Sequence, residues 1–230
     1  MMREIRGVLF DFNGTLFFDS EMHIEAFGYT CDNYGKPRYS REFIINNLFG
    51  KTNDRIFREY FKPDATDEEC ARFATMKKNL YFDICTAHPE RMHLVDGACE
   101  LLDYLKEHNV PFALATGSDG EELDFFMRHL GLARWFDIDR NVVFNNGRIV
   151  GKPAPDCYIE AARRLSLSSS ECAVFEDGGS GIAAARAADC AALIVVNEEG
   201  IPSPLGGEIV ADAEYHTLKD LTLISALLGL

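Results

Sequence analysis

The chain lacks several features that would assign it to other classes of protein. It has no apolar run of transmembrane length and no signal-like apolar segment near its start. Its seven cysteines are scattered and include no CxxC pair, so we expect reduced thiols rather than a disulfide frame or a zinc site. Basic residues are few, and the net charge of −14 disfavours nucleic acid or an anionic membrane as a partner. We predict a cytoplasmic protein and a monomer, although the absence of an exposed apolar heptad does not itself reveal the oligomeric state.

The composition is that of a globular protein, with 230 residues of which 47% are hydrophobic and 26% charged. This length allows one domain and a sizeable insertion. Residues 19–83 have a helical pattern, and four helices are expected there. Their starts are marked by Asp19 or Ser20, by Ser40, by the apolar residues around Ile56, and by Thr66 with Glu69 as a capping box. Four helices with no strand between them predict a small helical bundle.

From about residue 89 onward, helices and strands are expected to alternate. The expected elements are a helix over 97–108, a strand over 110–115, a helix over 119–130, a hairpin over 142–150, a helix over 155–165, a strand over 172–175, a helix over 179–188, a strand over 191–196 and a closing segment over 218–228. Such alternation predicts an α/β fold with a Rossmann-like parallel sheet. We therefore predict a core domain of residues 1–16 and 89–230, with an inserted helical cap of residues 17–88.

The first expected strand ends in a carboxylate. Residues 7–10 are apolar without polar alternation, as in a strand buried on both faces of a parallel sheet. Asp11 follows at once, and Gly14 allows a sharp turn beside it. Open α/β sheets bind ligands at the carboxyl ends of their strands. Asp11 is therefore a candidate site residue, although one acidic residue opening a surface loop is an ordinary feature.

Three further segments place polar groups near expected strand ends. Thr116-Gly117-Ser118 offers hydroxyls and a backbone amide suited to an anionic oxygen. Lys152 lies in a loop between a glycine and two prolines, and the prolines stiffen the loop. Glu176-Asp177 places two carboxylates together, which suits a divalent cation such as Mg²⁺. Taken singly, these segments also fit a helix cap or a solvated lysine. Together they predict a site for a metal ion and a phosphoryl group.

In this combination the sequence resembles the haloacid dehalogenase superfamily of phosphohydrolases, in the branch with a helical cap after the first motif. The matching motifs occur in order and span nearly the whole chain: residues 11–15, Thr116, Lys152 within residues 151–156, and Glu176-Asp177 with Gly181 and residues 184–188. The resemblance implies that Asp11 is the nucleophile and forms an aspartyl-phosphate.

The resemblance also implies the roles of the neighbouring residues. Mg²⁺ would be held by Asp11, by the main-chain carbonyl of Asn13 and by Asp177, with Glu176 close by. Thr116 and the amide of Gly117 would hold phosphate oxygens, with Ser118 beside them. Lys152 would neutralise charge on Asp11 and on the phosphoryl group, because phosphoryl transfer depends mostly on positioning and charge neutralisation.

Asn13 departs from the family pattern, which has an aspartate as acid and base at this position. An amide cannot give or take a proton at neutral pH, and general acid–base assistance is worth about 10²- to 10⁴-fold. Asn13 could be an engineered substitution, or a natural one that tolerates a good leaving group or relies on a cap residue. It could also mark a protein that binds a phosphorylated ligand with little turnover. Deamidation of Asn13-Gly14 would create an aspartate at this position.

The insertion is expected to select the substrate. His23 and Lys78-Asn79 resemble cap residues of the β-phosphoglucomutase-like branch, so we predict that they contact substrate, although a solvated helix face is the alternative for them. The loop at residues 50–53 lacks the arginine expected in the mutase. We predict a Mg²⁺-dependent phosphatase acting on a small phosphorylated metabolite, such as a sugar phosphate, and slowed by Asn13. The alternatives are a hexose-phosphate mutase and a weakly catalytic phosphate-binding protein.

Overall fold

The computed structural model describes residues 4–205, 210–220, 225–226 and 229. The chain divides into two compact units, one of residues 1–18 with 93–230 and one of residues 19–92. We call these the core unit and the helical unit. The cap domain proposed from the sequence, residues 17–88, stays a prediction. Within the described residues, no helix is both long and apolar enough to cross a bilayer.

The core unit is built on a parallel sheet of six strands in the order β3-β2-β1-β4-β5-β6. The strands are β1 Gly7–Phe10, β2 Phe112–Asp119, β3 Val142–Asn145, β4 Cys172–Glu176, β5 Ala192–Val196 and β6 Ala213–Tyr215. All residues of β1, β4 and β5 are buried, because helices cover both faces of the sheet. The predicted α/β fold with a parallel sheet is confirmed.

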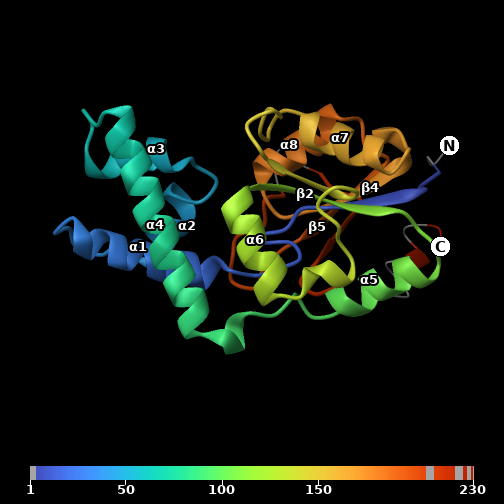
Figure 1. Cartoon of the computed structure of the whole chain (residues 1–230), viewed down its shortest axis with the longest axis horizontal. Helices are drawn as coiled ribbons and strands as arrows, with labels where there is room; N and C mark the ends of the chain where they lie inside the picture. Colours follow the sequence, from blue (N-terminus) through green and yellow to red (C-terminus); the bar gives the residue numbers. More distant parts are fainter. Residues whose placement is uncertain (1–3, 206–209, 221–224, 227–228, 230) are drawn as a thin grey trace. The chain divides into compact units, whose positions relative to one another are not determined.

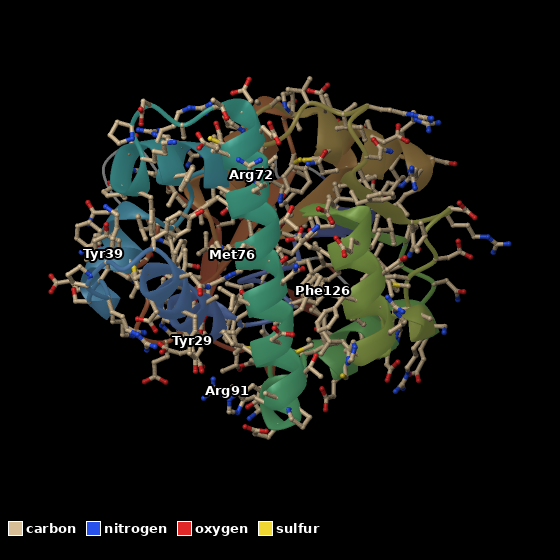
Figure 2. All side chains as sticks on the ribbon, turned by 60° about the vertical axis from the view of Figure 1, so that its left-hand side comes forward. Tyr29, Tyr39, Arg72, Met76, Arg91 and Phe126 are labelled. Carbon is tan, nitrogen blue, oxygen red and sulfur yellow. The ribbon has the colours of Figure 1, made fainter. Side chains whose placement is uncertain are left out.

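The helices of the core unit lie on both faces of this sheet. They are α5 Ala98–Glu107, α6 Gly120–His129, α7 Asp156–Arg164 and α8 Gly179–Ala187, with short 3₁₀ turns at Leu132–Arg134 and Ser169–Glu171. Figure 1 shows α7 and α8 on one face and α5 with α6 on the other. On the face covered by α7 and α8, Tyr158 of α7 and Ile182 of α8 belong to one buried cluster with Leu9 of β1. On α6, Phe126 (labelled in Figure 2) lies 4.8 Å from the Phe12 ring, between centroids.

Several predictions for the core unit were wrong. No hairpin forms over residues 142–150: within the described residues β3 pairs only with β2, in parallel. The amides of Gly147 and Arg148 donate to the side chains of Asn145 and Asn146, so local turns replace the second strand. Strand β2 continues to Asp119, beyond the predicted end, and β6 was not predicted. Most of the closing segment predicted over 218–228 lies outside the described residues.

The helical unit contains α1 Ser20–Asn33, α2 Arg41–Asn47, α3 Asn53–Ile56 with a π-helical turn Phe57–Phe61, and α4 Asp67–Ala87, followed by a 3₁₀ turn Pro89–Arg91. The predicted caps at Ser40 and Thr66 are confirmed, the second as a capping box with Glu69. Asp19 precedes α1 without a side-chain cap, and instead accepts a hydrogen bond of 2.7 Å from the Tyr81 hydroxyl.

The interior of the helical unit is largely aromatic. Phe73 on α4 is fully buried, and its ring lies 4.6 Å from that of Phe57 and 5.1 Å from that of Phe61, between centroids. Figure 2 shows Met76 and Arg72 one turn apart on α4. Met76 packs against the aromatic cluster, whereas exposed Arg72 pairs with Glu68. The apolar stripe of α4 thus faces the interior while its charged side chains face solvent.

Candidate active site

Three adjacent strands bring the main candidate residues to one edge of the sheet. β1 lies between β2 and β4 and is parallel to both. Asp11 follows β1 directly, Thr116 lies in the last half of β2, and Glu176 ends β4. Because the carboxyl ends of parallel strands meet at the same edge, residues separated by more than a hundred positions become neighbours.

Lys152 joins two of these strand ends by ion pairs. Its Nζ lies 2.5 Å from Asp11 Oδ1 and 2.7 Å from Glu176 Oε1. The side chains of Lys152 and Asp11 are each 11% exposed, and that of Glu176 is 3% exposed. Buried charges persist only when they are paired and hydrogen-bonded. The loop that follows β3 therefore places the ammonium group of Lys152 against the carboxylate of Asp11, which follows β1.

Both carboxylate oxygens of Glu176 are already engaged within the protein. Oε1 accepts from Lys152 and, at 3.1 Å, from the hydroxyl of Tyr158 on α7. Oε2 accepts from the backbone amides of Asp177 and Gly178, at 2.8 and 2.7 Å. Four donors on one carboxylate hold it in a fixed place. Glu176 thus positions Lys152 and is less available as a direct metal ligand than Asp11 or Asp177.

Asp11, Glu176 and Asp177 form an acidic cluster. One oxygen from each lies within 4.8 Å of the others. Burial raises the pKa of Asp11 to about 7, although the positive charge of Lys152 acts to lower it. The pKa of Asp177 is raised well above its usual range, mainly by burial and also by the negative charges of Glu176 and Asp11. A site in which anionic forms are disfavoured in this way would be stabilised by a cation. The all-oxygen donor set suits a hard divalent ion.

The charge of Lys152 is maintained by the same cluster. Burial alone would lower the pKa of the Lys152 ammonium, but the negative charges of Asp11 and Glu176 raise it well above its usual range. The group is therefore a fixed cation at neutral pH. It can neutralise negative charge beside Asp11 but is poorly suited to giving up a proton.

Two glycines make room for this cluster. A Cβ on Gly14 would lie 2.1 Å from Asp177 Oδ2, and Gly14 has a φ of +82°, which other residues rarely adopt. A Cβ on Gly181, in the first turn of α8, would lie 1.4 Å from Glu176 Oε1. Both positions need glycine because a carboxylate occupies the space of a side chain.

The turn after β1 is held by the backbone and by Asp177. The Gly14 amide donates to the Phe17 carbonyl at 2.8 Å, and Thr15 Oγ1 donates to Asp177 Oδ1 at 3.2 Å. On β2, the Ser118 amide donates to Thr116 Oγ1 and the Ser118 hydroxyl donates to Asn13 Oδ1, each at 3.1 Å. Gly117 between them is exposed. The structure thus brings Asn13 together with Ser118.

The candidate residues of the insertion lie in the helical unit. His23 is on α1, with its ring stacked on Tyr81 at a centroid distance of 4.3 Å and its Nε2 3.2 Å from Asp19 Oδ2. Lys78 is half-buried and Asn79 is exposed, both on α4. Contact of these three residues with a substrate stays a prediction.

Tyr158 and Thr15 were not singled out from the sequence. Tyr158 is fully buried among apolar side chains of α7, and Lys152 Nζ lies 4.9 Å from the centre of its ring. A tyrosine on the apolar face of a helix is indistinguishable from a core residue in sequence, and only the fold shows that its hydroxyl reaches Glu176. Thr15 directly follows Gly14, the glycine of the turn. Its place beside this turn is the feature of the sequence that could have marked it as a site residue.

Comparison with known proteins agrees with this geometry. Residues 5–189 match the family described as haloacid dehalogenase-like hydrolase. The chain is 28% identical to the phosphorylated carbohydrates phosphatase of Thermotoga maritima, over 80% of this chain and 82% of that protein. It is 29% identical to fructose-1-phosphate phosphatase YqaB of Escherichia coli, over 82% and 95%. The crystal structure of a family IA, variant 3 HAD hydrolase from Entamoeba histolytica superposes with a TM-score of 0.87 at 33% identity, covering 98% of both chains.

Proposed function

Since the chain belongs to the haloacid dehalogenase-like hydrolases, we propose that it hydrolyses small phosphate monoesters through an aspartyl-phosphate at Asp11. The observation that supports this most directly is the buried ion pair of Asp11 with Lys152. A carboxylate at a strand end, beside a fixed cation, is suited to attack a phosphorus atom that bears negative charge. The phosphatase relatives support the same class of reaction.

In the proposed reaction, each of these residues of the core unit has a separate role. An oxygen of Asp11 attacks the phosphorus atom, and the bond to the leaving oxygen breaks. Thr116 and the Gly117 amide bind non-bridging oxygens, with Ser118 beside them, while Lys152 offsets charge on Asp11 and on the phosphoryl group. Water then releases phosphate from Asp11. Holding charged groups in place supplies most of the rate enhancement in phosphoryl transfer.

Asp11 and Asp177, together with the main-chain carbonyl of Asn13, would hold a Mg²⁺ ion. The crowded carboxylates and their raised pKa values fit a cation at this place, and Glu176 stands close enough to join through water. When bound, Mg²⁺ neutralises phosphate charge. A readout independent of turnover is thermal unfolding: ions binding the folded state at 100 times Kd stabilise it by about 2.7 kcal/mol. We expect this stabilisation to be lost in Asp177→Asn.

Sugar phosphates are the substrate class that the relatives favour. Two relatives are named as phosphatases of phosphorylated carbohydrates and of fructose 1-phosphate. We propose that His23, Lys78 and Asn79 of the helical unit contact the sugar. A screen of sugar phosphates by phosphate release, with His23→Ala and Lys78→Ala beside wild type, would test this. Both variants should raise KM for the preferred sugar phosphate and leave KM for p-nitrophenyl phosphate unchanged.

Release of inorganic phosphate from p-nitrophenyl phosphate tests the reaction itself. We expect turnover with Mg²⁺, loss with EDTA and recovery on adding Mg²⁺ back. Asp11→Asn should lower the rate by a factor on the order of 10⁴ or more, because the nucleophile is gone. Equal rates in wild type and Asp11→Asn would contradict the proposal.

Asn13 favours a second candidate function, in which the chain binds a phosphorylated ligand with little turnover. In that case Mg²⁺ and a phosphate analogue would stabilise the protein while phosphate release stayed at background. A hexose-phosphate mutase would instead return the phosphoryl group to sugar, visible as an isomerised sugar phosphate without free phosphate.

A further inference from the structure

The side chain of Asn13 is fixed at the position where a proton donor would be expected. Its Oδ1 accepts from the Ser118 hydroxyl at 3.1 Å, and Ser118 is only 9% exposed. Its backbone forms a bridge with Phe17, supported by the Gly14 amide bonded to the Phe17 carbonyl. The side-chain amide of Asn13 is thus held in the turn after β1, two residues along the chain from Asp11. A carboxamide there can form hydrogen bonds but cannot transfer a proton.

Four proton-bearing side chains of the cluster around Asp11 donate to protein oxygens. Among the residues that the structure describes, Lys152 donates to Asp11 and Glu176, Tyr158 donates to Glu176, and Thr15 donates to Asp177. The hydroxyl proton of Ser118 is engaged with Asn13. Each of these four donors is therefore already hydrogen-bonded to a carboxylate or an amide oxygen of the protein.

We propose that this site selects phosphate compounds whose leaving oxygen is weakly basic, such as a carboxylate or a phenolate. This inference rests on the proposed function and narrows its substrate class. A weakly basic oxygen departs as an anion and needs no acid, whereas a primary alkoxide does. A phosphorylated sugar would accordingly be cleaved at an anomeric phosphate in preference to a phosphate on a primary alcohol.

The reaction balances without an acid for such compounds. With an acyl phosphate, Asp11 forms a bond to phosphorus while the bond to the acyl oxygen breaks, and the electron pair leaves with the carboxylate. Water then forms a new bond to phosphorus and the bond to Asp11 breaks. One proton of that water stays on the phosphate and the other goes to solvent.

The test compares leaving groups of different basicity in wild type and in Asn13→Asp. The substrates are acetyl phosphate, p-nitrophenyl phosphate, a sugar 1-phosphate and the 6-phosphate of the same sugar, with Mg²⁺ throughout. The readout is kcat/KM, because it reports the steps up to transfer onto Asp11 and is insensitive to later hydrolysis of the phosphoenzyme. The carboxylate in Asn13→Asp is close in size to the amide and can still accept from Ser118, so the substitution changes mainly the ability to transfer a proton.

We expect kcat/KM of wild type to fall steeply along the series toward the 6-phosphate. Asn13→Asp should gain about 10²- to 10⁴-fold on the 6-phosphate and less than about tenfold on acetyl phosphate, since general acid catalysis acts only where the leaving group needs a proton. An equal gain on all four compounds would overturn the inference. So would a wild-type series with no dependence on leaving-group basicity, which can be judged even if the variant does not fold.

The outcomes also separate this inference from the proposed function. If wild type releases no phosphate from any compound, acetyl phosphate included, the proposed function fails. If it hydrolyses acetyl phosphate and the 6-phosphate at similar kcat/KM, the proposed function stands and only the leaving-group selectivity fails.

Discussion

The two units of the chain bury different kinds of side chain. The core unit buries an ammonium group and carboxylates, those of Lys152, Asp11 and Glu176, whereas the helical unit fills its interior with rings such as those of Phe57 and Phe73. The pair of Arg72 with Glu68 lies at the surface of the helical unit. That unit also buries one carboxylate, that of Asp19, which accepts from the Tyr81 hydroxyl. Burying charge is costly, and a protein gains little stability from it. The core unit therefore buries a cluster of three charged groups at a cost in stability, whereas ring packing dominates the interior of the helical unit.

The largest effect is expected from removing the buried cation. Lys152→Ala leaves Asp11 and Glu176 without their shared positive partner, so we expect activity to fall at least about 10³-fold and stability by about 3–5 kcal/mol. Lys219→Ala is the matched control, because Lys219 pairs with Asp96 where both side chains are more than half exposed. Such a pair is worth about 0–1 kcal/mol. Urea unfolding and phosphate release measure both effects; similar losses in the two variants would break the comparison.

A comparable loss of stability, without a direct effect on chemistry, is expected in the helical unit. Phe73→Ala removes a fully buried ring, which costs about 3–5 kcal/mol through lost burial and the cavity left behind. The neighbouring Arg72 is exposed, so Arg72→Ala should change stability by about 1 kcal/mol or less. Thermal unfolding by circular dichroism distinguishes them. A Phe73→Ala protein as stable as Arg72→Ala would show that the aromatic cluster does not hold the unit together.

An intermediate effect is expected where glycine makes room for Glu176. Gly181→Ala forces a methyl group into the Glu176 carboxylate, which four hydrogen bonds hold in place, so we expect a loss of about 1–3 kcal/mol together with lowered activity. Gly179 lies on the same helix with no atom within 4 Å of an added Cβ. Gly179→Ala should stay within about 1 kcal/mol of wild type. Identical activity in the two variants would contradict the assigned contact.

The smallest effect is expected from a helix cap. Thr66→Ala breaks the capping box at the start of α4 and should cost about 1 kcal/mol. Thr75 lies inside the same helix and donates to the Ala71 carbonyl on the exposed side. Thr75→Ala should be neutral or slightly stabilising, since alanine is the better helix former. Denaturant midpoints at constant m-value would measure the difference.

The sequence was sufficient to predict the residues at the strand ends. An apolar run followed by Asp11, and another followed by Glu176-Asp177, indicated parallel strands whose ends meet, and the structure brings these residues together with Lys152. Their positions follow from local patterns and one rule of topology. The predicted roles in catalysis are still to be tested by experiment.

The failures have physical causes that a single sequence does not show. Asn146-Gly147 is a strong hairpin signal, but β3 pairs with β2 and the following residues turn away. The three residues of β6 are too few to show an alternating pattern. In the sequence, Tyr158 is indistinguishable from an ordinary core residue. The direction of its hydroxyl depends on how α7 packs on the sheet, which the sequence does not show. Nonlocal pairing and side-chain orientation both arise only in the folded chain.

The position of β1 has a consequence for how the protein is made. β1 is synthesised before both of its partners, which are residues 112–114 and 172–175. Residues 19–92 leave the ribosome before either partner and can assemble as a unit while β1 is still unpaired. Asp11 therefore meets Glu176 only after β4 has been synthesised. A nascent chain that stalls before β4 leaves one side of the apolar strand β1 unpaired, and this exposed edge is a target for chaperones.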